Sequence, residues 1–323
     1  MNDEKTIGQS AEMIGTIKNE ISKAFIGQQK LVDYTLITLM AGGHILLEGL
    51  PGLGKTLLVR SIAKAIGGDS KRVQFTPDLM PSDITGHIML NTSNQKFITK
   101  KGPVFTNFLI ADEINRAPAK TQAALFEAMQ EFQVSLDGTG HPLPKPFMTL
   151  ATQNPLEHEG TYPLPDAQKD RFLMKVIVPF PNIEEETEMV RKVLSGNTGA
   201  KLSTESVNPV TSPEAFSKLQ EITASQTVEP AVIDYAVRLA AATRTTGALQ
   251  SGAGPRGSLA LIRCAKALSL MEGRSFVLPD DVKALAVPAL AHRVLLSAES
   301  EIDGLNEDQV IGQIVDQTEA PRS

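Results

Sequence analysis

The sequence is poor in the residues that mark several protein classes. It has no tryptophan, one cysteine and an aromatic fraction of only 5%. A single thiol cannot close an internal disulfide, and Cys264 lies among apolar residues at helical spacing with no metal-ligand companions. No apolar run approaches the ~18 residues that cross a bilayer. These absences argue against a disulfide scaffold, a zinc centre and a membrane span, and we expect Cys264 to be buried and inert.

Strong basic charge is missing too. The 323 residues carry a net charge of −6, which argues against a broad nucleic-acid-binding surface. Residues 1–9 are polar and lack the basic start and apolar stretch of a signal peptide, so we expect a cytoplasmic protein. A hydrophobic fraction of 41% and a charged fraction of 21% are typical of a globular chain. The length predicts one large domain with a smaller one, or two of similar size.

What is present is a complete G-x-x-x-x-G-K-[ST] pattern between an apolar run at 44–47 and a helical pattern at 57–65. This strand, loop and helix order is the context of a phosphate-binding loop, in which glycines let backbone N–H groups approach the phosphates. Lys55 is expected to reach the outer phosphates and Thr56 to ligate Mg²⁺. The nucleotide-binding residues predicted here are Gly49, Leu50, Pro51, Gly52, Leu53, Gly54, Lys55, Thr56 and Leu57.

A second apolar strand, at 107–111, ends in adjacent carboxylates. We expect Asp112 to bind the nucleotide's Mg²⁺ and Glu113 to orient and polarise the attacking water. The alternative is that the two carboxylates only begin the next helix, where they favour its dipole. A third strand at 147–152 leads to Asn154, an amide that can contact the γ-phosphate or the water, or can instead satisfy backbone groups in a turn.

The remaining pattern predicts two hairpins and a helical second half. Alternating residues indicate hairpins at about 87–101 and 132–143, the second with an Asp137-Gly138 turn. A short helix is expected at 164–172, and the polar end, 297–323, is expected to be partly disordered. Beyond residue 179 the predicted helices are 182–194, 212–225, 229–246, 255–271 and 279–291.

Together these segments resemble the MoxR family of AAA+ ATPases. Residues 49–56 match the Walker A motif, 107–113 match Walker B, and Asn154 matches sensor 1. The stretch 102–131 resembles the family signature along almost its whole length. The resemblance covers roughly residues 20–300 and implies an α/β fold, a P-loop αβα sandwich with a parallel sheet followed by a smaller all-helical lid.

The resemblance also implies a domain plan. The nucleotide-binding core would occupy 1–181, with an insert in its second helix at about 87–101 and a hairpin before sensor 1 at about 132–143. Residues 182–211 would form a linker helix and loop, and 212–323 the lid. Both insertions are expected to face the central pore of a hexameric ring.

The family further implies roles for residues that carry no chemistry by themselves. Arg171 resembles an arginine finger that reaches the neighbouring subunit's nucleotide, and Arg256 a sensor 2 residue near the phosphates of its own or an adjacent subunit. Ile26 and Gly27 lie where AAA+ proteins contact adenine. The resemblance thus implies ATP and Mg²⁺ as cofactors, and Glu113, Asn154, Arg171 and Arg256 as the catalytic set.

Two classes of function remain open at this point. One is a chaperone-like ATPase that remodels a client protein or helps insert a metal cofactor, commonly with a von Willebrand A domain protein. The other is a nucleic-acid motor, disfavoured by the acidic balance although Lys96, Lys100 and Lys101 form a small cationic cluster. ATPase stimulation by DNA with steep salt dependence would favour the motor. A small-molecule kinase is a weaker third possibility.

Overall fold

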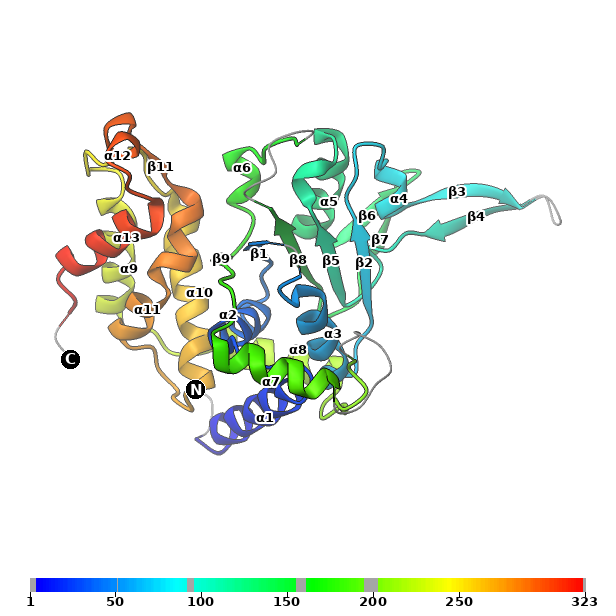
Figure 1. The fold of residues 1–323 in the computed structure, drawn as a ribbon, viewed down its shortest axis with the longest axis horizontal. Helices are drawn as coiled ribbons and strands as arrows, with labels where there is room; N and C mark the ends of the chain where they lie inside the picture. The colour runs from blue at the N-terminus through cyan, green and yellow to red at the C-terminus, as the bar shows by residue number, and fades with distance from the viewer. Residues whose placement is uncertain (1–3, 51, 92–95, 155–160, 195–202, 322–323) are drawn as a thin grey trace.

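The computed structural model describes residues 4–50, 52–91, 96–154, 161–194 and 203–321. Figure 1 shows a central sheet wrapped by helices, a helical lid on one side and a long hairpin that projects from the opposite side. Within the described ranges, no helix is long and apolar enough to span a bilayer.

The central sheet has five strands in the order β2-β5-β8-β1-β9, and all neighbours are parallel. Parallel strands buried on both faces read as continuous apolar runs, which is why the sequence shows them clearly. Their carboxyl ends meet at one edge, where open α/β sheets bind ligands. The strands are β1 (Ile45–Glu48), β2 (Ser70–Gln74), β5 (Phe108–Asp112), β8 (Met148–Gln153) and β9 (Met174–Ile177).

Alternate strand residues face two separate hydrophobic clusters. Ile45 and Leu47 belong to the cluster shared with the lid, whereas Leu46 belongs to the other. On the first face lie α1 (Glu4–Ser22), α2 (Gln29–Met40) and α3 (Lys55–Ile66). On the second lie α4 (Pro81–Thr85) and α5 (Ala119–Glu131). The sheet is therefore the middle layer of an αβα sandwich.

Both predicted hairpins are present. β3 (Gly86–Asn91) pairs with β4 (Lys96–Lys101), and this is the hairpin that projects from the body in Figure 1. Its tip, 92–95, lies outside the described residues. The smaller hairpin pairs β6 (Gln133–Leu136) with β7 (Thr139–Pro142). Asp137 and Gly138 both have positive φ at its turn, as a two-residue loop that matches the strand twist requires.

The lid is built on α10, which packs against α9, α11, α1 and α2. Cys264 in α10 is fully buried, as expected, and burial raises the pKa of its thiol to about 12. The hydrophobic cluster of the lid continues into the first face of the core without a break. The elements after the sheet are α6 (Asp166–Lys169), α7 (Ile183–Leu194), α8 (Pro213–Ala224), α9 (Pro230–Ala242), α10 (Pro255–Met271) and α11 (Pro279–Leu290).

Several local expectations were wrong. Within the described part of the polar end, 297–321, the chain forms α12 (Ala298–Ile302) and α13 (Glu307–Gln317), because α13 buries the apolar pairs Val310-Ile311 and Ile314-Val315 against the lid. The lid also holds a two-stranded sheet, β10 (Leu249–Ser251) with β11 (Leu295–Leu296), which the helical pattern does not predict.

Two helices are shorter than expected. α6 covers only Asp166–Lys169 of the predicted 164–172, and α9 ends at Ala242 rather than at 246. By contrast, the predicted cap of α7 is present, since Asn182 Oδ1 accepts a hydrogen bond from the Glu185 N–H at 2.8 Å. Part of the predicted linker, 195–202, lies outside the described residues.

Candidate nucleotide-binding site

The phosphate loop joins β1 to α3 at the carboxyl edge of the sheet. Gly52 and Gly54 adopt positive φ values of 87° and 77°, which favour glycine. No side chain caps the start of α3, so the first N–H groups of that helix are available to an anion. Leu50 is half-buried at the loop's entry, and Pro51 lies outside the described residues.

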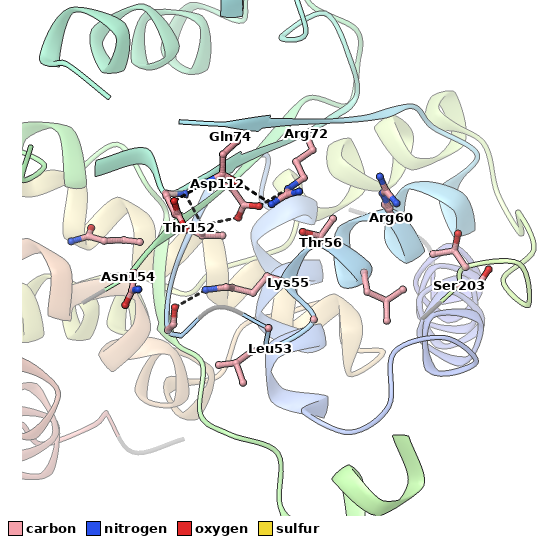
Figure 2. Close-up of a pocket in the computed structure, with 17 residues that line it drawn as sticks. Leu53, Lys55, Thr56, Arg60, Arg72, Gln74, Asp112, Thr152, Asn154 and Ser203 are labelled. Atoms are coloured by element: carbon pink, nitrogen blue, oxygen red, sulfur yellow. Dashed lines mark hydrogen bonds and ion pairs between the residues drawn. The ribbon is translucent and has the colours of Figure 1, made fainter. Parts of the chain in front are cut away.

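A pocket at this edge gathers most of the predicted site. It combines loop residues with Asp112 at the end of β5, Glu113 directly after that strand, and the amide that follows β8. Figure 2 shows Lys55, Asp112 and Asn154 in this pocket. The predicted residues that line it are Gly49, Gly52, Leu53, Gly54, Lys55, Thr56, Leu57, Asp112, Glu113 and Asn154. Residues from three strands that are distant in the sequence thus share one cavity.

Lys55 is held inside this pocket. It is 9% exposed, and its Nζ donates to the carbonyl of Gly49 at 2.7 Å. Burial lowers the pKa of Lys55, while the charges of Asp112 and Glu113 oppose that shift. The ammonium therefore lies beside the loop backbone, where an outer phosphate of a bound nucleotide would find it.

Asp112 is 8% exposed and has two partners on neighbouring strands. Its Oδ1 accepts from the Thr152 hydroxyl at 2.8 Å, and its Oδ2 pairs with Arg72 Nε at 2.6 Å. Bonds to both oxygens fix the orientation of this carboxylate. Thr152 also accepts from the Glu113 N–H at 2.9 Å, so one hydroxyl on β8 sets the position of both acidic residues.

Glu113 lies at a sharp turn directly after β5. Its φ of 55° is unusual for a non-glycine residue, and such strain is common at functional sites. Its Oε2 accepts from Gln74 Nε2 at 2.7 Å and from Arg116 Nη1 at 3.0 Å. β2 therefore contacts both acidic residues, Asp112 through Arg72 and Glu113 through Gln74.

The residues fit a magnesium nucleotide. The loop offers uncapped N–H groups and a buried ammonium to phosphate oxygens, and Thr56 and Asp112 supply the oxygen ligands that Mg²⁺ prefers. When bound, the metal would neutralise charge on the outer phosphates. Glu113 stands in the same pocket, where it can orient a water molecule.

Sequence reasoning assigned no role to several residues of this pocket. Arg60 and Arg72 add positive charge, and Ser203 and Thr204 also line the pocket. Figure 2 shows Arg60 and Ser203 on the same side of it. Arg60 follows Thr56 by four residues on α3, so helical spacing could have found it. The others reach the pocket only through strand order and the path of the chain after α7.

Arg171 and Arg256 do not line this pocket. They line a second one together with Asp170, and Arg256 Nη1 pairs with Asp170 Oδ2 at 3.5 Å. The Arg171 guanidinium lies 5.7 Å from the ring centre of Phe126, and its Nε is buried without a hydrogen-bond partner. Two of the four predicted catalytic residues therefore lie together, apart from Glu113 and Asn154.

Arg293 connects this second pocket to the lid. Its side chain is 3% exposed, and its Nε pairs with Asp170 Oδ1 at 2.8 Å. Its Nη2 donates to the carbonyls of Asp170 and Phe172 at 3.2 and 2.7 Å, on both sides of Arg171. His292 adds a bond to the Phe172 carbonyl at 2.9 Å. No role was predicted for this His-Arg pair from the sequence, and in the structure it forms a joint between lid and core.

The predicted adenine contacts lie at the other end of the phosphate pocket. Ile26 lines an adjoining cavity with Leu53 and Leu57. Gly27 has a φ of 70° and is covered by Glu185 from α7. The two cavities share Gly52, Leu53, Gly54 and Leu57, so a charged cavity and an apolar cavity adjoin at the phosphate loop.

Comparisons with known proteins agree with this geometry. Residues 44–174 match the model of the ATPase family associated with various cellular activities (AAA), and residues 241–314 match that of the AAA lid domain. Chaperone MoxR1 of Mycobacterium tuberculosis is 43% identical over 94% of this chain and 81% of its own length. Protein MoxR of Methylorubrum extorquens is 31% identical over 88% of each chain.

A solved structure has a similar fold. A protein from Cytophaga hutchinsonii superposes with a TM-score of 0.90 and 40% identity, over 97% of this chain and 96% of that one. The likeness covers the sandwich and the lid together. The phosphate loop, the paired carboxylates, the lid and these full-length relatives show that the chain belongs to the MoxR family of AAA+ ATPases.

Proposed function

We propose that this protein hydrolyses ATP to ADP and phosphate with Mg²⁺, in a ring in which each subunit completes the nucleotide site of the next. It would couple that cycle to the remodelling of a client protein in the cytoplasm. The chaperone name of the Mycobacterium relative supports the second part of the proposal.

One observation carries the proposal: Arg171 and Arg256, the two arginines to which the family resemblance gives catalytic roles, do not line the pocket that holds the carboxylates. Glu113 and Asn154 line the phosphate pocket, whereas Arg171 and Arg256 line another. Lys55, Arg60 and Arg72 already line the phosphate pocket, and charge that develops on the γ-phosphoryl is stabilised further by a cation that arrives only on assembly. A second subunit that presents its Arg171 to the phosphate pocket would supply this cation.

Within one subunit the remaining roles are local. Lys55 and the loop N–H groups would bind the phosphates, and Thr56 and Asp112 would hold the metal. Glu113 would orient the attacking water, with Asn154 nearby at 8% exposure. The Thr152 hydroxyl bonds the Asp112 carboxylate and the Glu113 backbone N–H, so Thr152 acts as a positioning residue.

The projecting hairpin supports a protein client. Four apolar side chains on β3 and β4 are exposed, and Phe97 is 77% exposed. Exposed apolar clusters of this kind mark contact sites for other proteins. The residues are Met89, Leu90, Phe97 and Ile98. A von Willebrand A domain protein, a metal-cofactor recipient or another client would meet the ring here.

Mixing two inactive variants tests the shared site. Glu113→Gln keeps its arginines but lacks the carboxylate, whereas Arg171→Ala keeps its carboxylate but lacks the finger. We expect each variant alone to bind ATP and to lose at least about 100-fold in turnover. Mixed subunits should regain activity, because some sites combine an intact Glu113 with an intact Arg171.

The control is a mixture of Glu113→Gln with Lys55→Ala, both of which damage the same pocket. An intact phosphate pocket then never forms, so this mixture should stay inactive. If the first mixture stays as inactive as the second, or if Arg171→Ala alone hydrolyses ATP at the wild-type rate, the proposed sharing between subunits is wrong.

A further inference from the structure

The apolar end of the nucleotide site has a polar group that the sequence did not assign. Its walls are Phe25, Leu53, Leu57, Phe180 and Met189. Phe25 is 5% exposed, and its ring lies 3.1 Å from the point that a Cβ on Gly54 would occupy. The cavity therefore begins directly beside the phosphate loop and has the flat apolar surfaces that a purine base needs.

Glu185 brings a carboxylate into this apolar cavity. Its Oε1 accepts from the Gln28 N–H at 2.9 Å, and its Oε2 accepts from the Asn182 N–H at 3.1 Å. A carboxylate offers about four acceptor positions, so these two bonds leave about two for another donor. The second bond belongs to the capping box of α7, which holds the carboxylate in place.

Gly27 leaves room for the Glu185 side chain. A Cβ at Gly27 would lie 2.4 Å from Glu185 Cδ, and its φ of 70° also favours glycine. The corner between α1 and α2 is thus built to receive this carboxylate, 157 residues further along the chain.

A second acceptor lines the same cavity. Gln28 Oε1 is buried and has no hydrogen-bond partner. An unpaired acceptor and a carboxylate with unused positions both call for a ligand edge that carries N–H donors. At position 6 adenine presents an amino group, which donates, whereas guanine presents a carbonyl oxygen, which accepts.

We propose that Glu185, together with Gln28, selects a 6-amino purine, so that the site discriminates ATP from 6-oxo nucleotides. The proposal rests on the proposed function in one respect, that the phosphates bind at the loop. A 6-oxo base would place its oxygen against the carboxylate and carries its donor on that edge at N1 instead of at position 6, so the hydrogen bond to the 6-amino group would be lost.

Calorimetric titration tests this proposed selection, with ATP, inosine triphosphate and inorganic tripolyphosphate as the ligands. Inosine triphosphate replaces the 6-amino group by an oxygen, and tripolyphosphate reports the loop alone. We expect the wild type to bind ATP at least about tenfold more tightly than inosine triphosphate. Glu185→Gln keeps the capping box but adds an amide donor. The preference of this variant for ATP over inosine triphosphate should therefore fall to about threefold or less.

The controls separate this proposal from the function on which it rests. Glu188→Gln lies on the same helix at an exposed position and should keep the wild-type ratio. Gly27→Ala must displace the Glu185 carboxyl and should lose discrimination as Glu185→Gln does. Glu188→Gln and Gly27→Ala should both bind tripolyphosphate like the wild type, whereas Lys55→Ala should not.

Two results would overturn specific statements. If Glu185→Gln and Gly27→Ala both keep the wild-type ratio while binding tripolyphosphate normally, Glu185 does not read the base. If Lys55→Ala binds tripolyphosphate as tightly as the wild type, the assignment of the loop fails instead. Thermal melting followed by circular dichroism identifies any variant that does not fold. If either Glu185→Gln or Gly27→Ala fails to fold, the other variant decides whether Glu185 reads the base.

Discussion

At the scale of single residues, two threonines on β8 show that the effect of a buried hydroxyl depends on whether it has hydrogen-bond partners. Thr149 and Thr152 are both buried. The Thr152 hydroxyl bonds Asp112 and the Glu113 N–H, whereas the Thr149 hydroxyl has no hydrogen-bond partner. An unpaired buried hydroxyl costs free energy, and a paired one holds its neighbours in place.

This contrast predicts opposite outcomes for the same substitution. Thr152→Val should lower the free energy of unfolding by about 1–3 kcal/mol, because Asp112 and the Glu113 N–H each lose a partner. It should also lower ATP turnover. Thr149→Val should be neutral or stabilising. Urea denaturation of both variants measures the difference, and equal losses of stability would contradict the assigned hydrogen bonds.

His44 gives a prediction for pH. The Thr149 N–H donates to its Nδ1 at 3.0 Å, so the proton lies on Nε2, which donates to the Met129 carbonyl at 2.9 Å. Burial lowers the pKa of His44 to about 4 from the usual 6.5. Between these values the unfolded state binds more protons than the folded state, so stability is lost as pH falls from 6.5 toward 4.

The predicted loss from His44 is about 3 kcal/mol across that range. His44→Gln should retain a donor to Met129 and flatten the dependence of the unfolding free energy on pH between 6.5 and 4. His87, exposed on the β3–β4 hairpin, provides the control, because His87→Gln should follow the wild-type profile. Denaturation at a series of pH values would settle the matter, and parallel profiles for all three proteins would exclude His44 as the source.

At the scale of elements, the β3–β4 hairpin depends on the two glycines at its base. A Cβ on Gly86 would lie 2.1 Å from the Lys100 carbonyl oxygen, and one on Gly102 would lie 2.2 Å from that of Ile84. Gly86 also has a φ of 91°. These contacts let the chain turn from α4 into the hairpin and back to the core.

Gly86→Ala should therefore open the hairpin base and destabilise it by more than about 1 kcal/mol. Hydrogen exchange of the β3 and β4 amides should accelerate, while the central sheet stays protected. Gly247→Ala is the matched control, because a Cβ there meets nothing within 4 Å. Unchanged exchange in Gly86→Ala would show that the base tolerates a side chain.

The elements also show what sequence alone could predict. The buried strands, the phosphate loop and both hairpins follow from apolar periodicity and turn residues, which are local signals. The approach of Gln74 to Glu113, of Glu185 to Gly27 and of Arg293 to Asp170 depends on tertiary packing, which no local pattern carries. The order of α13 was missed because its polar composition hides the Val310-Ile311 and Ile314-Val315 pairs.

At the scale of the whole molecule, one buried arginine joins the lid to the core. Arg293 reaches from the end of α11 to Asp170 and to the backbone on either side of Arg171. Burial lowers the pKa of Arg293, and the Asp170 charge opposes that shift. The lid therefore supports the segment that carries the proposed finger.

Arg293→Gln should cost about 3 kcal/mol, because it removes one partner of a largely buried ion pair. It should also lower turnover more than ATP binding if the joint positions Arg171. Arg238→Gln breaks an exposed pair with Asp234 and should cost at most about 0.5 kcal/mol. Thermal unfolding and nucleotide titration of both variants test this, and equal shifts in Tm would argue against the joint.

The separation of the two pockets determines how many complete nucleotide sites an assembly would contain. An assembly joined head to tail through such unlike faces is directional, so an open row of n subunits would contain n − 1 complete sites and only closure would supply the last. Activity per subunit would then rise with the length of the row and jump when the ends meet. A plot of specific activity against the mean number of subunits per particle would reveal whether the rows close.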